Sequence, residues 1–110
     1  MKGTKKIEIS GEQITLRFTT GVIEDIQEYQ EQNDLSEQDL DKMKHMRVMF
    51  ALMELYATED EWKDPDILDK AKEASFKFKN VDASQLGELM SIVNEVTEQV
   101  GNVQTPKEKK

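Results

Sequence analysis

The stretch EQDLDKMKHMRVMFALMELYA, residues 37–57, decides the fold of this chain. From residue 46 onward only two charged residues interrupt a run of apolar ones, so a helix formed here is apolar on nearly every side. Such a helix is normally central and surrounded by other elements. We therefore expect it to form the centre of the core, with Phe50 and Met53 among its most buried residues.

Methionines are concentrated in the same stretch. It contains four of the six in the chain, and they are Met43, Met46, Met49 and Met53. Methionine is typical of irregular cores and also of apolar grooves that accept a partner. A core position is the first interpretation, because a stripe at helical spacing is commonly packing. A groove for a partner helix is the second.

Upstream, the segment KIEISGEQITLRF, residues 6–18, alternates apolar and polar residues around Gly11, which predicts a β-hairpin. We expect Gly11 and Glu12 to form its turn. This register places the apolar side chains on one face, which helices must cover because a hairpin alone is marginal. The expected cross-strand pairs are Ile9 with Ile14 and Ile7 with Leu16.

The period changes to that of a helix after residue 18, with Thr20 as a cap and with Asn33 and Asp34 at its end. Residues 19–41 carry eight acidic and no basic side chains. This charge either keeps the protein soluble or steers a basic partner toward it. The acidic residues on the first helix are Glu24, Asp25, Glu28 and Glu31.

Trp62 stands in TEDEWKD, residues 58–64, which is predicted to be a loop. No periodic stripe explains this tryptophan. It is either a lid over the central helix or an exposed anchor for a partner, since tryptophan is enriched in interface hot spots. The neighbouring Glu59, Asp60 and Glu61 favour a basic partner.

Two further helices are expected downstream. The first begins at Pro65 and ends near Phe78, and the second is capped by Ser84 or Asp82 and ends at Gly101. The expected fold class is therefore α+β, mostly α, with an N-terminal β-hairpin followed by about four helices around a central Met-rich helix. We expect a single compact domain over residues 1–101 and a flexible polar tail over residues 102–110.

Composition excludes several classes of function. The 110 residues carry a net charge of −8, which argues against nucleic acid as a partner, and the absence of cysteine removes disulfides and thiolate sites. No apolar run approaches a membrane span, so we expect a cytoplasmic protein. His45, the one histidine, lacks a ligand partner at helical spacing and is predicted to be a surface or boundary residue. We expect no cofactor, no metal and no enzymatic activity.

The order of elements resembles that of the tail assembly chaperones of long-tailed bacteriophages and prophages. The likeness covers residues 5–100 and rests on three features: the hairpin segment, the acidic helix GVIEDIQEYQEQ, and the Met-rich helix leading into FALMELYATEDEW. Membership would imply a protein of the infected host's cytoplasm that binds the tape measure protein and keeps it soluble while tail tube subunits assemble around it.

The residues themselves leave the partner open. The expected binding surface combines apolar and acidic side chains on a helix-binding face, namely Trp62, Glu24, Asp25, Glu28, Glu31, Met43, Met46 and Met49. One alternative is a structural phage subunit that self-associates into a homo-oligomer through its hairpin edge. Another is an acidic inhibitor that mimics nucleic acid.

Overall fold

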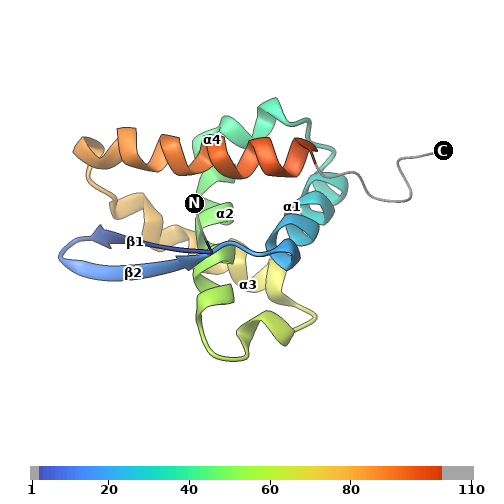
Figure 1. Cartoon of the computed structure of the whole chain (residues 1–110), viewed down its shortest axis with the longest axis horizontal. Helices are drawn as coiled ribbons and strands as arrows, with labels where there is room; N and C mark the ends of the chain where they lie inside the picture. Colours follow the sequence, from blue (N-terminus) through green and yellow to red (C-terminus); the bar gives the residue numbers. More distant parts are fainter. Residues whose placement is uncertain (1–2, 103–110) are drawn as a thin grey trace.

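A computed structural model describes residues 3–102 and shows, in that range, an N-terminal β-hairpin followed by four α-helices (Figure 1). The predicted α+β, mostly α class is confirmed. Short 3₁₀ turns connect the helices, at residues 38–41, 61–63, 75–80 and 83–85. The main elements are β1 (Thr4–Ile9), β2 (Glu12–Arg17), α1 (Thr20–Asn33), α2 (Met43–Ala57), α3 (Ile67–Ala74) and α4 (Leu86–Asn102).

Helix α2 runs through the middle of the molecule, and β2, α3 and the 3₁₀ turn 75–80 all pack against it (Figure 1). Phe50 is 2% exposed and Met53 is fully buried, which confirms the prediction for this helix. The buried apolar side chains of the hairpin and of all four helices join them in one core cluster. Helix α4 packs on α1 and contributes its own buried side chains to this core.

The predicted start of the central helix at residue 37 is wrong, because α2 begins at Met43. Residues 38–41 form a separate 3₁₀ turn, and Lys42 after it is extended. The carboxylate of Asp39 accepts hydrogen bonds from the backbone N–H and the hydroxyl of Ser36, at 2.8 and 3.1 Å. This Ser36–Asp39 arrangement is typical of a helix start, but here it closes a single turn.

The hairpin buries the face that was predicted, but its strands pair in a different register from the predicted one. Ile7 pairs with Ile14, and Ile9 pairs with Glu12, so Ser10 and Gly11 form the turn. Both turn residues have positive φ, 52° and 83°, as a two-residue type I′ turn requires. Glycine at the second position meets this requirement without strain, whereas the predicted turn would have placed Glu12 there.

The remaining ends differ from prediction by a few residues. The cap of α1 is Thr19. Helix α3 begins at Ile67, because the Asp64 carboxylate accepts the N–H of Asp66 at 2.7 Å and holds the preceding residues in a turn. Helix α4 continues through Gly101 to residue 102, and the rest of the predicted tail lies outside the described residues. No helix in residues 3–102 is long and apolar enough to cross a membrane.

Candidate partner-binding site

The acidic residues of α1 have unequal surroundings. Asp25 is half-buried, and its carboxylate accepts a hydrogen bond from the Tyr56 hydroxyl at 2.5 Å. Burial raises the pKa of Asp25, and burial together with this bond raises the pKa of Tyr56. Asp25 thus joins α1 to α2, whereas Glu24, Glu28 and Glu31 lie exposed on the outer side of α1.

Trp62 is neither fully buried, as a lid over the central helix would be, nor fully exposed, as a free anchor would be. It is 47% exposed and lines a cleft of about 430 Å³, which we call the Trp62 cleft. Lys70 forms ion pairs with the loop around Trp62. Its ammonium lies 3.2 Å from the carboxylate of Glu61 and 2.6 Å from that of Asp64. These pairs compensate part of the negative charge that was expected to attract a basic partner. The Trp62 cleft is lined by Arg17, Thr19, Gly21, Glu24, Tyr56 and Trp62.

An apolar groove lies at the opposite end of α2. Met43 and Leu86 are 46% and 38% exposed there, and Phe50 and Phe78 form its inner wall. Its volume is about 160 Å³, and a cavity of ~150 Å³ lined by apolar side chains binds a benzene-sized group. This Met43 groove is lined by Met43, Met46, Arg47, Phe50, Phe78, Lys79, Val81, Asp82, Ala83, Leu86 and Leu89.

The predicted binding residues therefore do not form one surface. Met43 and Tyr56 stand thirteen residues apart on α2, about 20 Å along the helix, and the Met43 groove and the Trp62 cleft share no lining residue. Met46 lies buried at the floor of the groove, and Met49, 1% exposed, lies in the core. The core interpretation is right for these two methionines, and Met43 is the residue left accessible.

Comparison with known proteins adds no relative. No family model, no curated protein and no solved structure matches this chain.

His45 is 7% exposed, so its predicted surface or boundary position is wrong. The Nδ1 atom of its ring lies 2.8 Å from the Tyr29 hydroxyl, and the two rings meet edge to face. Burial, and then the nearby Lys44, lower the pKa of His45. The Tyr29–His45 pair lines a cleft that also contains four cationic side chains. The sequence did not predict this cleft, because two of the cations come from distant segments, Lys72 on α3 and Lys79 on the following turn.

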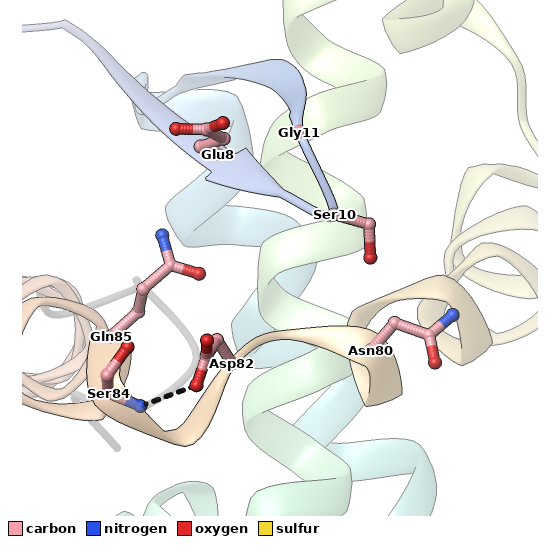
Figure 2. A pocket seen from close by; sticks show the side chains of 7 residues that line it. All are labelled: Glu8, Ser10, Gly11, Asn80, Asp82, Ser84 and Gln85. Carbon is pink, nitrogen blue, oxygen red and sulfur yellow. Dashed lines mark hydrogen bonds between the residues drawn. The ribbon is translucent and has the colours of Figure 1, made fainter.

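A polar depression separates the hairpin turn from the connector before α4 (Figure 2). Its lining comes from residues 8–11 on one side and 80–85 on the other, and six of the seven lining residues are exposed. Figure 2 shows one hydrogen bond between them, from the Ser84 N–H to the Asp82 carboxylate at 3.0 Å, which caps the next turn. In residues 3–102 no three His, Asp or Glu side chains come together as metal ligands would. The predicted absence of a metal stays a prediction.

Proposed function

We propose that this protein is a non-enzymatic tail assembly chaperone of a phage or prophage, which binds the tape measure protein and keeps its apolar helices soluble during tail assembly. The observation that carries the proposal is the Met43 groove, an apolar hollow open to solvent on a highly charged protein. The resemblance in the order and character of the elements names the partner class.

The groove suits a helical partner. An amphipathic helix binds by laying apolar side chains, spaced three or four residues apart, into a hydrophobic groove. The Met43 side chain is flexible and polarisable, so it adapts to different side chains of a long partner. Burial of apolar surface supplies most of the affinity, because the inner wall of phenylalanine and leucine is already in place.

The acidic side of α1 has a separate part in this proposal. Glu24, Glu28 and Glu31 point away from the core, and they contribute to a net charge of −8. Such charge keeps a complex with an apolar protein in solution and changes its association rate more than its affinity. We do not assign Asp25 to this charged surface, because its carboxylate is hydrogen-bonded to the Tyr56 hydroxyl.

Co-expression with a tape measure protein tests the proposal. We expect the partner to become soluble and to co-elute with this protein on gel filtration. The double variant Met43→Glu/Leu86→Glu, which places carboxylates in the groove, abolishes the complex, whereas Trp62→Ala, in the separate Trp62 cleft, serves as the matched control. A tape measure protein that is equally soluble without this chain contradicts the proposal. Loss of binding in Trp62→Ala alone moves the binding site to the Trp62 cleft.

One observation favours a structural subunit as a second candidate. The sheet has two strands within the described chain, so the outer edge of each strand has no strand partner there. Such edges are templates for pairing with another copy. Charged residues on the strands, among them Lys5, Lys6 and Arg17, weaken this tendency. Stable rings of the isolated protein in analytical ultracentrifugation would support the structural role over the chaperone.

A further inference from the structure

A basic cleft of about 460 Å³ lies beside the Met43 groove, although the protein as a whole is strongly acidic. Lys44 and Arg47 come from α2, Lys72 from α3, and Lys79 from the turn after it. Arg47 and Lys79 also line the Met43 groove, so the two hollows share a wall.

The four cations of the basic cleft have no carboxylate partner within 4.0 Å in the part of the chain that the structure describes. Other lysines on this protein do have such partners, and they are Lys5, Lys42, Lys63, Lys70 and Lys77. With many acidic side chains available, four unpaired cations around one hollow leave a concentrated positive field there. The field is complementary to an anionic partner.

Two of the four cations lie over aromatic rings. The Lys72 ammonium lies 5.9 Å from the centroid of the Tyr29 ring, and the Lys79 ammonium lies 5.1 Å from that of Phe76. These distances are within the range of a cation–π attraction. Phe76 is 63% exposed, the largest exposure among the large apolar side chains of residues 3–102. The cleft thus offers an apolar contact next to its charges.

We propose that the basic cleft binds an acidic segment of a partner protein, with carboxylates of the segment on Arg47, Lys44, Lys72 and Lys79 and an apolar side chain on Phe76. Arg47 binds a carboxylate through two parallel N–H groups, and the lysines act as point charges around it. This site differs in chemistry from the Met43 groove and does not depend on the identity of the groove's partner.

A peptide fits the cleft better than a nucleic acid does. A single strand tracks its phosphates along a positive groove over several nucleotides, with successive bases stacked on aromatic rings. Here the four cations gather around one hollow and the wall it shares with the Met43 groove, and the neighbouring turn 38–41 and α1 are acidic. A long polyanion would meet repulsion on leaving the cleft, whereas a short acidic segment would not.

The experiment is a titration of the ¹⁵N-labelled full chain with the synthetic peptide acetyl-EELEE-amide in 50 mM salt, followed by NMR. We expect shifts of the backbone amides of residues 44–48 and 72–79. Lys44→Gln/Lys79→Gln, at two exposed positions, weakens binding by about tenfold or more, because it removes two of the four cations that would contact the carboxylates. Lys5→Gln/Lys63→Gln is the matched control and leaves binding unchanged. Higher salt also weakens binding.

Three results would overturn the proposal. The first is the absence of shifts at millimolar peptide in a protein whose spectrum shows it to be folded. The second is equal binding of acetyl-QQLQQ-amide, which would show that carboxylates are not recognised. The third is displacement of the peptide by a single-stranded 12-nucleotide DNA that binds more tightly at the same residues, which would assign the cleft to nucleic acid.

Discussion

Phe50 contributes to the core and to the inner wall of the Met43 groove. Its side chain is 2% exposed, and its ring centroid lies 5.8 Å from that of Phe78. We predict that Phe50→Ala lowers the free energy of unfolding by about 3–5 kcal/mol, because truncating a buried aromatic residue leaves a cavity. Denaturation in urea measures the loss.

Met43→Ala is the matched control on the same helix. Met43 is 46% exposed, so we expect its truncation to change the free energy of unfolding by about 1 kcal/mol or less. If Phe50→Ala also costs less than about 1 kcal/mol, the inner wall of the groove is not part of the cooperative core.

The buried His45 predicts a dependence of stability on pH. Because burial and Lys44 lower its pKa in the folded protein, the unfolded chain takes up a proton near pH 6.5 that the folded chain does not. The stabilisation is therefore complete above about pH 6.5 and is lost as the pH falls below it. We expect the free energy of unfolding to decrease from pH 7.5 to 5.5, and to decrease less in His45→Gln.

An NMR titration of the His45 ring provides the direct check. We expect its midpoint to lie below that of an unstructured peptide. A midpoint above about 6.5 would mean that the contact with the Tyr29 hydroxyl favours the charged ring, and stability would then rise on acidification.

At the scale of the helix, two glycines have opposite surroundings. A Cβ atom on Gly21, in the first turn of α1, would lie 2.9 Å from the ring and the hydroxyl of Tyr56, which Asp25 holds in place. A Cβ atom on Gly87, in the first turn of α4, would meet nothing within 4 Å.

We predict that Gly21→Ala destabilises the protein by about 1–3 kcal/mol through overpacking. Gly87→Ala stabilises it by up to about 1 kcal/mol through lower chain entropy of the unfolded state. Thermal unfolding of the two variants, followed by circular dichroism, measures the difference. Equal effects of the two substitutions would show that α1 shifts away from Tyr56 at little cost.

At the scale of the molecule, charges of like sign are segregated. Acidic side chains dominate residues 19–41, and four cations with no carboxylate partner among residues 3–102 surround the basic cleft. Both arrangements repel internally, and salt screens repulsion between exposed charges. We predict that raising sodium chloride from 20 to 300 mM increases the free energy of unfolding in urea by a few tenths to about 1 kcal/mol. A decrease would show that the surface ion pairs contribute more than the repulsion.

Local pattern in the sequence determined the elements and the faces that they bury. The apolar run after residue 46 predicted the central helix with its buried Phe50, and alternation predicted which face of the hairpin is covered. The predicted register was wrong, but the predicted buried face was right. The observed partner of each residue lies two positions from the predicted one, and side chains two positions apart on a strand lie on the same face.

The tertiary structure alone decided which side chains share a surface. Whether a methionine of α2 is core or groove depends on what packs over it, and the packed molecule leaves Met43 46% exposed at the groove while Met49 is 1% exposed in the core. The basic cleft unites α2 with Lys72 and Lys79, about thirty residues later in the chain. Periodicity describes neighbours along one element, whereas these surfaces arise from contacts between elements, which no local pattern encodes.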